Sequence, residues 1–456
     1  MSIDILNAIS YFVLVYFIIL SFLYVLILIC SIKDIYVSFN VFSLSNQGEF
    51  FSKVDLPPVT VIIPAFNEEN NLFDAIESVF NSADYNNIFV IVVNDGSTDK
   101  TLETLIQRYD LYETNEMLEK KLKVYGAIRN HYRSRKDINI MVIDKENGKK
   151  SDALNAGVNA CRTSIFITMD ADTIVEPNAI SALVWDMIAK KNALAVGGGV
   201  YILNGCTHKG GTITEFRMSK NPIPAVQACE YLRSFLFSRS GWNVFGGALC
   251  YSGAFTLFDA KSIVDIGGFD YQNIAQDFEI ITHLQAHIRD QHIVGSVSYT
   301  PAAIAWTIVP ETLAEFWHQR IGWQMGSLRS LMRHKKMLCN PKYGALGFFT
   351  YPFFLFGEIG GAVVEFIAYA TAIASWYLGL LSMGVITKIL ILCWGFTACL
   401  TFSTTLISML TFNRYRSLSD IIWIFLITGI EMCGFRQYSV VCRVYATLKY
   451  CFVRRP

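Results

Sequence analysis

The sequence predicts an α/β domain, built on a doubly wound and mostly parallel sheet, that is joined to an α-helical transmembrane bundle. Two observations predict this. Hydrophobic residues make up 53% of the 456 residues, and they gather in long runs near the two ends of the chain. Between these runs, short β-branched segments alternate with stretches that have the 3.6-residue period of helices.

The first apolar run, residues 5–30, contains no charged side chain. It exceeds the roughly 20 residues that cross a bilayer core. A signal peptide would be shorter, with a basic start and a small-residue cleavage site, whereas Asp4 precedes this run. We therefore predict a retained transmembrane helix within residues 1–43.

Apolar runs return after Tyr343, at residues 347–381, 385–412 and 421–448. They predict a C-terminal bundle of about three spans within residues 343–456, hence four spans in all. A fifth would follow if the last run were a hairpin broken near Gly434. Residues 44–309 have the composition of a globular domain, and residues 310–342 predict amphipathic interface helices.

Basic residues indicate the orientation because they favour the cytoplasmic side of a membrane. Those beside the spans are Lys33, Lys53, Lys335, Lys336, Lys342, Arg414 and Arg416. We expect a multi-pass protein of the cell (inner) membrane with a cytoplasmic central domain. The tail, with Lys449, Arg454 and Arg455, has the same preference, but a single crossing from Asp420 would place it outside. Either the last segment is re-entrant or a hairpin broken near Gly434, or the basic tail lies outside in spite of the preference of basic residues for the cytoplasm.

Charge and cysteine usage exclude other classes of protein. The formal net charge is zero, and no basic block argues for nucleic acid. The eleven cysteines show no CxxC spacing. They are typical of small buried residues in reducing surroundings.

Three aspartates lie where apolar strand segments end. Asp95 ends the segment "IFVIVVND", and Asp170 and Asp172 follow the apolar residues 165–169. Parallel sheets bind ligands at the carboxyl ends of their strands, and paired carboxylates suit a hard divalent cation. An Asp-Gly turn is the alternative for Asp95, and Asp-X-Asp alone is a weak signal.

Seven motifs in order resemble those of membrane-integrated family-2 glycosyltransferases, the group of cellulose, chitin and hyaluronan synthases. The likeness is greatest to the bacterial poly-N-acetylglucosamine synthase type. The motifs are "VIIPAFNEE", "VVNDGSTDKT", "NGKKSDALNAG", "MDADT", "SGAFTLFDAKSIVDIGGFD", "AQDFEI" and "WTIVPETLAEFWHQRIGW". They cover about residues 55 to 340, and the resemblance implies a GT-A-like fold for the α/β domain.

The resemblance also implies a nucleotide-sugar pocket. The family's first Asp motif holds the nucleoside, so Asp95 would contact the uracil or ribose. The residues carried over to this pocket are Pro64, Asn67, Glu68, Asp95, Lys149 and Asp170. Asp170 and Asp172 would bind Mg²⁺ or Mn²⁺ across the diphosphate and stabilise the departing charge.

The family's third acidic motif, Thr-Glu-Asp, is here Ala275-Gln276-Asp277. Asp277 thus matches the catalytic base that takes the acceptor's proton. One direct displacement would convert an α-linked donor into a β-linked product. Gln276 departs from the family Glu, which removes a charge beside the base.

The acceptor-binding residues that the resemblance implies are Gln319, Arg320, Trp323, Ser252 and Gly253. A tryptophan face is a good platform for a sugar ring. Gly322 stands where the Gln-X-X-Arg-Trp signature has its diphosphate-binding arginine. Arg320 or Arg329 could substitute for it.

Three functions stay open. The first is a processive synthase that polymerises a UDP-sugar and exports the polymer through its own spans. The second is an enzyme that adds one sugar to a lipid acceptor, and the third is a degenerate, non-catalytic synthase subunit. We expect the lipid bilayer, a UDP-sugar and a polysaccharide or lipid-linked acceptor as partners, and allow for a small accessory membrane subunit.

Overall fold

The computed structural model describes residues 3–45, 56–82, 87–136, 138–190, 192–412 and 414–452. Lys53, Arg454 and Arg455 therefore lie outside the described residues, as does the junction at residues 46–55. The chain divides into two compact units. Residues 33–216 and 246–309 form one, here called the sheet unit, and residues 1–32, 217–245 and 310–456 form the other, here called the helical unit.

The sheet unit contains a ten-stranded sheet of order β3-β4-β5-β2-β1-β6-β11-β8-β12-β7. Its strands are β1 (Val59–Ala65), β2 (Ile88–Asp95), β3 (Leu111–Glu113), β4 (Ile128–Ser134), β5 (Ile140–Lys145), β6 (Ile165–Met169), β7 (Ile174–Val175), β8 (Ala193–Ile202), β11 (Phe255–Asp259) and β12 (Ser296–Thr307). A separate hairpin joins β9 (Thr207–Lys209) to β10 (Thr212–Glu215). The helices are α2 (Leu72–Phe80), α3 (Thr101–Tyr109), α4 (Lys149–Ala160), α5 (Ala179–Ala189), α8 (Ala260–Asp265) and α9 (Gln276–Asp290).

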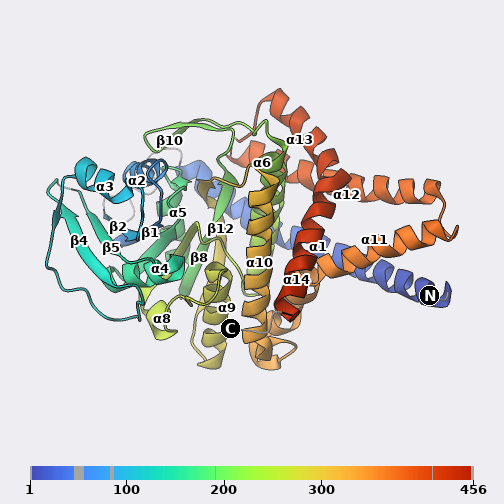
Figure 1. The fold of residues 1–456 in the computed structure, drawn as a ribbon, viewed down its shortest axis with the longest axis horizontal. Helices are drawn as coiled ribbons and strands as arrows, with labels where there is room; N and C mark the ends of the chain where they lie inside the picture. The colour runs from blue at the N-terminus through green and yellow to red at the C-terminus, as the bar shows by residue number, and fades with distance from the viewer. Residues whose placement is uncertain are drawn as a thin grey trace. The chain divides into compact units, whose positions relative to one another are not determined.

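The centre of the sheet is parallel, from β5 through β2 and β1 to β6. All residues of β5 and β6 are buried, because helices cover both faces, as a continuous apolar run predicts. Antiparallel pairs occur toward both ends, where β4 joins β5 and β11 joins β6. The predicted doubly wound α/β class is confirmed, and the antiparallel strands flank its parallel centre (Figure 1).

The helical unit contains most of the apolar sequence. Its main helices are α1 (Ile3–Ser45, as far as residue 32), α6 (Pro222–Tyr231), α10 (Leu313–Arg333), α11 (Gly361–Tyr377), α12 (Met383–Phe412), α13 (Leu418–Ile430) and α14 (Arg436–Phe452). Shorter π-helical turns include η2 (Leu232–Ser238), η6 (Leu346–Thr350), η7 (Phe353–Ile359) and η8 (Glu431–Phe435). The segment 217–245 joins this unit although it lies between strands of the sheet in the sequence.

Three helices are long and apolar enough to cross a membrane: Asp4–Asn40, Trp394–Phe412 and Leu418–Phe452. A pair bent by 42°, Leu346–Ile359 with Gly361–Tyr377, would make a fourth. By length and composition, the described residues thus hold up to four spans. The last candidate is broken at Cys433 and Gly434, whose backbone is not helical, as the sequence suggested near Gly434.

Two glutamates of the apolar segments pair with arginines inside the helical unit. Glu431 accepts from Arg233 of η2, and Glu365 of α11 accepts from Arg436 at 2.5 and 3.0 Å. Such pairs offset the cost of placing a charge in apolar surroundings. The geometry therefore gives these two glutamates a role in joining helices.

Helix α4 lies unusually close to β1, and this closeness depends on Gly157. A Cβ atom at that position would lie 2.3 Å from Ile62 Cγ2. We expect Gly157→Ala to destabilise the protein by about 1–3 kcal/mol through overpacking. The measurement is thermal unfolding of the full chain in detergent. Gly395→Ala, where a Cβ meets nothing within 4 Å, is the control, and equal effects of the two changes would contradict the expectation.

Candidate functional site

The carboxyl ends of the parallel strands bring acidic side chains to one edge of the sheet. Asp95 is the last residue of β2, and Asp170 directly follows β6. Strand β1 pairs in register with both, since Ala65 lies beside Asn94 and Ile62 beside Thr168. Pro64 belongs to β1 itself. The predicted convergence at the strand ends is therefore present in the sheet unit.

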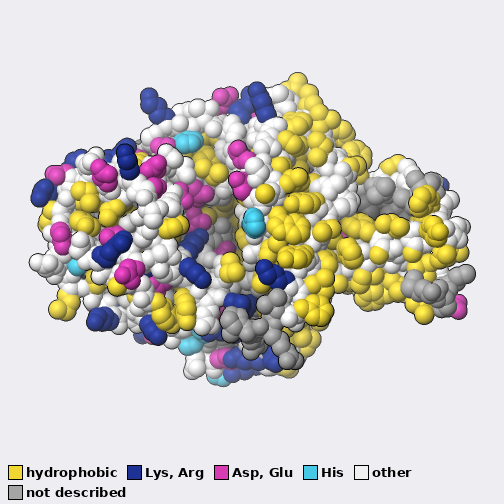
Figure 2. Space-filling model, viewed as in Figure 1, with side chains coloured by type: hydrophobic (Ala, Val, Ile, Leu, Met, Phe, Trp, Pro, Cys, Tyr) yellow, Lys and Arg dark blue, Asp and Glu magenta, His cyan; other side chains and the backbone are white. Residues whose placement is uncertain are grey.

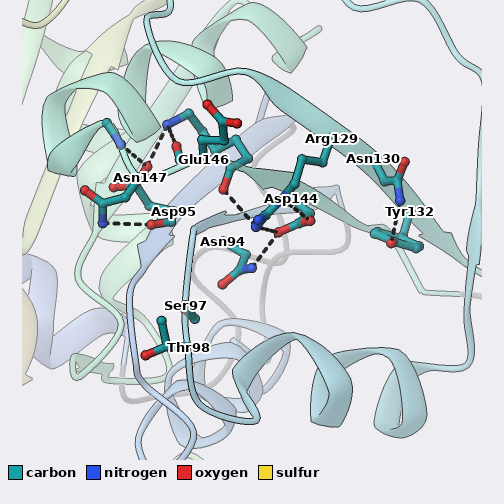
Figure 3. Close-up of polar contacts among 12 residues, drawn as sticks. Asn94, Asp95, Ser97, Thr98, Arg129, Asn130, Tyr132, Asp144, Glu146 and Asn147 are labelled. Atoms are coloured by element: carbon teal, nitrogen blue, oxygen red, sulfur yellow. Dashed lines mark hydrogen bonds and ion pairs between the residues drawn. The ribbon is translucent and has the colours of Figure 1, made fainter.

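Asp95 is held by a buried lysine that sequence reasoning missed. Lys145 Nζ lies 2.6 Å from Asp95 Oδ1 and 2.8 Å from Asp152 Oδ2, and all three side chains are at most 4% exposed. The Gly148 backbone N–H donates to Asp95 Oδ1 at 3.0 Å, and Asn147 Nδ2 donates to the Asp95 carbonyl at 2.9 Å (Figure 3). A charged residue at the end of the apolar segment "INIMVIDK" was the available signal.

The turn interpretation of Asp95 is only part of its role. Gly96 has φ +75°, and a Cβ there would lie 2.7 Å from the Asn147 nitrogen, so the Asp-Gly turn exists. The Asp95 carboxylate nevertheless bonds Lys145 and Gly148, and it is Asp99 whose Oδ1 accepts from the Thr101 N–H at the start of α3, at 3.0 Å. The carboxylate is thus fixed at the strand end and not used to start the next helix.

A second ion pair lies next to the first (Figure 3). Arg129 of β4 donates to both Asp144 oxygens, at 2.8 and 2.7 Å, and Asn94 Nδ2 donates to Asp144 Oδ1 at 2.7 Å. Bidentate pairs of this kind add geometric specificity. They tie β4, β5 and β2 together immediately beside Asp95.

Asn67 and Glu68 lie in the loop after β1. Asn67 has φ +58°, and its Oδ1 accepts from the Thr98 N–H at 2.8 Å. The Glu68 N–H donates to Thr101 Oγ1 at 3.0 Å. These bonds join the loop after β1 to the loop after β2. Asn67 therefore shapes the strand-end loops, and the Glu68 side chain accepts from Asn71 at 3.1 Å.

A lysine in the first turn of α4 is the centre of a second polar cluster. Lys150 Nζ lies 2.5 Å from Asp170 Oδ1. The Gln276 amide oxygen lies 3.1 Å from the same Nζ in the orientation that also lets its NH₂ donate to Ile274. Burial lowers the pKa of Lys150, but the charge and hydrogen bond of Asp170 outweigh this and raise it. The structure thus brings Lys150 to Asp170, whereas the sequence pointed to its neighbour Lys149.

Asp172 and two nearby carboxylates form a strongly acidic group. Burial raises the pKa of Asp172 to about 7, and the charges of Asp170 and Glu68 act in the same direction. Thr307 Oγ1 donates to Asp172 Oδ1 at 3.1 Å. Burial also raises the pKa of Glu68. Close carboxylates raise one another's pKa because their negative charges repel, and a bound cation would stabilise their ionised forms.

Asp277 lies in the first turn of α9. Its Oδ2 accepts from the Gly253 N–H at 3.3 Å and its Oδ1 from the Phe278 N–H at 2.8 Å. Burial raises the pKa of this carboxyl, and the charge of Lys150 partly offsets the rise. A Cβ at Gly253 would lie 3.2 Å from Asp277 Cβ, so glycine permits the close approach.

A small cavity lies beside Asp277. Ser252, Gly253 and Gln276 contribute to its wall together with apolar side chains from β11 and α9. The Ser252 carbonyl accepts from Thr256 at 2.7 Å, which fixes the bend that presents Gly253. Both predicted acceptor residues of this segment therefore adjoin the predicted base.

The remaining predicted acceptor residues lie on α10 in the helical unit. A capping box starts this helix, since the Glu315 N–H donates to Thr312 Oγ1 at 3.2 Å. Arg320 is paired with Glu230, and its guanidinium lies 4.9 Å from the Trp323 ring centre. Trp323 is 41% exposed. Because Arg320 is already paired, the geometry does not support it as a replacement for an arginine at Gly322.

Comparison with known proteins identifies the same family that the motifs resemble. The profile described as "Glycosyl transferase family 2" matches residues 60–263, and that described as "Glycosyl transferase family group 2" matches residues 165–430. Poly-beta-1,6-N-acetyl-D-glucosamine synthase of Staphylococcus aureus (strain MSSA476) is 27% identical over 279 residues. Its counterpart in Staphylococcus epidermidis is 26% identical over 275 residues. The resemblance inferred from the motifs is confirmed.

These relatives are matched over part of their length. The alignments cover 61% and 60% of this chain but only 57% and 56% of the two synthases. Among solved structures, the mannosyltransferase PcManGT from Pyrobaculum calidifontis, in complex with GDP-Man and Mn²⁺, has a TM-score of 0.52 at 14% identity. That match covers 94% of this chain and all of the other, and it shows a shared fold.

Lys145 should be essential to the stability of the site. We expect Lys145→Met to cost about 3–5 kcal/mol, because it leaves the Asp95 and Asp152 carboxylates buried without their cation. The measurement is denaturant unfolding of the full chain in detergent. The exposed Lys120→Met is the control. Adding Asp95→Asn and Asp152→Asn to Lys145→Met should recover part of the loss, and a loss unaffected by them would exclude uncompensated charge as its cause.

Proposed function

Because the chain belongs to the glycosyl transferase family 2 group, we propose that it is a membrane-bound, inverting glycosyltransferase. It transfers a sugar from a UDP-sugar to a growing β-linked polysaccharide. The observation that carries this proposal is the cluster around Lys150. Lys150 Nζ lies 2.5 Å from Asp170 Oδ1, and its positive charge also stabilises the ionised form of the neighbouring Asp277. The candidate base Asp277 lines the small cavity, and the ion pair of Lys150 with the candidate metal ligand Asp170 lies near it.

Asp277 is the proposed catalytic base. It would accept the proton of the acceptor hydroxyl as that oxygen attacks the anomeric carbon. Two backbone N–H groups hold its oxygens in place, and burial makes it a stronger base than an exposed aspartate. A single displacement at the anomeric carbon gives inversion.

Lys150 is the proposed counter-charge for the leaving group. Negative charge develops on the departing diphosphate, and a fixed cation in a partly buried site stabilises it. Lys150 also stands in the first turn of α4, whose N-terminus favours anions. The preceding Gly148 bonds Asp95, so one short segment links the proposed diphosphate and nucleoside positions.

Asp170 and Asp172 are the residues that would hold a divalent cation, Mg²⁺ or Mn²⁺. Among the residues that the structure describes, no three His, Cys, Asp or Glu side chains gather to enclose a metal. Mg²⁺ in nucleotide sites is held by one or two protein carboxylates and completes its shell with substrate phosphate oxygens. The raised pKa of Asp172 and the Mn²⁺ in the complex of the mannosyltransferase support the assignment. When bound, the cation would neutralise charge on the diphosphate.

The proposed product is a polymer of N-acetylglucosamine, since the relatives are named as synthases of that polymer. Export would use the transmembrane helices of the helical unit, and the basic residues beside them support a cytoplasmic sheet unit. Transfer of one sugar to a lipid is the second candidate. The specific observation that favours it is Gly322 in place of the signature arginine.

The full chain in lipid nanodiscs, incubated with labelled UDP-GlcNAc, UDP-glucose, UDP-glucuronate or GDP-mannose and Mg²⁺ or Mn²⁺, tests the proposal. We expect a high-molecular-weight β-linked product from UDP-GlcNAc, lost in Asp277→Asn. Lys150→Met should lower kcat/KM by about 10²–10³, as removal of a transition-state donor does. Lys149→Met, the matched control one residue away, should change it far less.

Other results would redirect the assignment. A lipid-soluble monoglycoside would support the second candidate. If no donor gave transfer, and Asp277→Asn behaved like the unchanged chain, the result would support a non-catalytic synthase subunit. Equal effects of Lys149→Met and Lys150→Met would overturn the role given to Lys150.

Cation binding should weaken as the pH falls below about 7. The pKa of Asp172 is raised to about 7, so its carboxyl is mostly protonated at pH 6, and a bound cation must displace that proton. We expect the apparent Kd for Mn²⁺, measured by electron paramagnetic resonance in the presence of UDP, to rise about fivefold from pH 7 to pH 6. It should stay nearly constant from pH 8 to pH 9. In Asp172→Asn we expect weak Mn²⁺ binding whose Kd no longer changes between pH 7 and pH 6. If the Kd still changed, a group other than Asp172 would carry the competing proton.

A further inference from the structure

Helix α13 is too short to cross a bilayer. Its 13 residues extend about 20 Å, against a hydrocarbon core of about 30 Å. Its second turn is tied to the segment before α6, because Trp423 Nε1 donates to the Ser219 carbonyl at 2.8 Å. Just past its end the chain breaks at Gly434, which has φ +129°.

Helix α14 does not continue the direction of a span but lies along α10. Tyr438 donates to the Leu313 carbonyl at 3.1 Å, and further on Gln324 donates to Thr447 at 3.0 Å. The two helices thus run side by side in the same direction. Figure 1 shows both crossing the direction of α11 and α12.

This pairing sets the depth of α14. Helix α10 contains charged side chains along its length, so it cannot lie within hydrocarbon. It contains Glu315, Arg320, Arg329 and Arg333. The start of α14 is also level with the start of α11, since Arg436 pairs with Glu365 in the second turn of that helix. Helix α14 therefore lies beside the bend between η7 and α11, where Arg443 also donates to the Glu358 carbonyl.

The outward face of α14 is apolar, and its inward face combines small buried side chains with polar contacts to α10. Val441, Tyr445, Leu448 and Phe452 repeat at i, i+4, i+7 and i+11 and are 45%, 46%, 50% and 79% exposed; we call them the α14 stripe. On the inward side, Arg443 Nε donates to Gln324 Oε1 at 3.0 Å. A helix on a water-facing surface would have the reverse arrangement. The face over α13 and α14 in Figure 2 is largely apolar.

The basic residues near the α14 stripe indicate that anionic lipid covers it. Lys449 lies beside Leu448 on the exposed side, and Arg454 and Arg455 follow in the sequence. Apolar residues flanked by basic ones are typical of a helix at the boundary between acyl chains and anionic headgroups. A protein partner would not require this combination.

We propose that α13 enters the bilayer without crossing it and that α14 lies flat on the same membrane surface as α10, with the α14 stripe among the outer acyl chains. The C-terminus is then on the side of the membrane where α10 lies. The candidate span Leu418–Phe452 is a half-span followed by a surface helix. This arrangement decides between the two topologies that the basic tail left open, and it holds whatever reaction the sheet unit catalyses.

Spin labels measure the depth of the stripe. Single nitroxides replace Val441, Tyr445, Leu448 and Phe452 in the full chain, in a background without other cysteines, in nanodiscs with anionic lipid. Power saturation with oxygen and a water-soluble nickel complex should give nearly one depth for all four sites. A spanning helix would instead change depth by about 16 Å from Val441 to Phe452. Labels at Leu392 and Leu410, both exposed on α12, are the positive control for changing depth.

The same measurement separates other occupants of the stripe. Low accessibility to both reagents would show that protein covers it, including a second copy of the chain, and high accessibility to nickel alone would show water. Either result would overturn the proposal.

Sidedness provides an independent test. In sealed vesicles of one orientation, an impermeant maleimide should label a cysteine at Phe452 from the same side as one at Lys335. A cysteine at Leu380, after α11, should be labelled from the opposite side. Labelling of Phe452→Cys together with Leu380→Cys would show that the chain crosses the membrane after α12, contrary to the proposal.

Discussion

The ion pairs of Lys145 with Asp95 and Asp152 are the constraint on which the sheet unit's strand ends depend. Lys145 ends β5, Asp95 ends β2, and Asp152 lies in the first turn of α4. A buried cation shared by two carboxylates fixes these three elements at one point, because losing any member leaves a charge without compensation. Through Gly148 the same point sets where α4 begins, and hence where Lys150 meets Asp170.

The helical unit is organised by a related principle in an apolar setting. Arginines of η2 and α14 pair with glutamates that would otherwise be costly to bury. Gln324 bonds both Arg443 and Thr447, so the polar groups of α10 and α14 satisfy each other. The side chains of the α14 stripe are left to face outward. Polar contacts therefore join the helices, while the surface of the unit suits lipid.

Much of the fold and part of the site could be predicted from the sequence. The apolar runs and the strand ends at Asp95 and Asp170 follow from local periodicity. Lys145 could not be assigned, since its two partners are 50 and 7 residues away in the chain. The choice of Lys150 over Lys149 depends on the direction in which each side chain leaves the first turn of α4, which spacing alone does not determine.

The sequence by itself determined the class of the fold, the family resemblance and the acidic positions, because each depends on residues close together in the chain. Only the tertiary structure decided that residues 217–245 join the helical unit, that Arg320 is paired with Glu230, and that α14 lies along α10. These outcomes depend on which distant groups satisfy one another's charge and hydrogen bonds. Periodicity predicts that a helix is amphipathic, but its partner determines which face is buried.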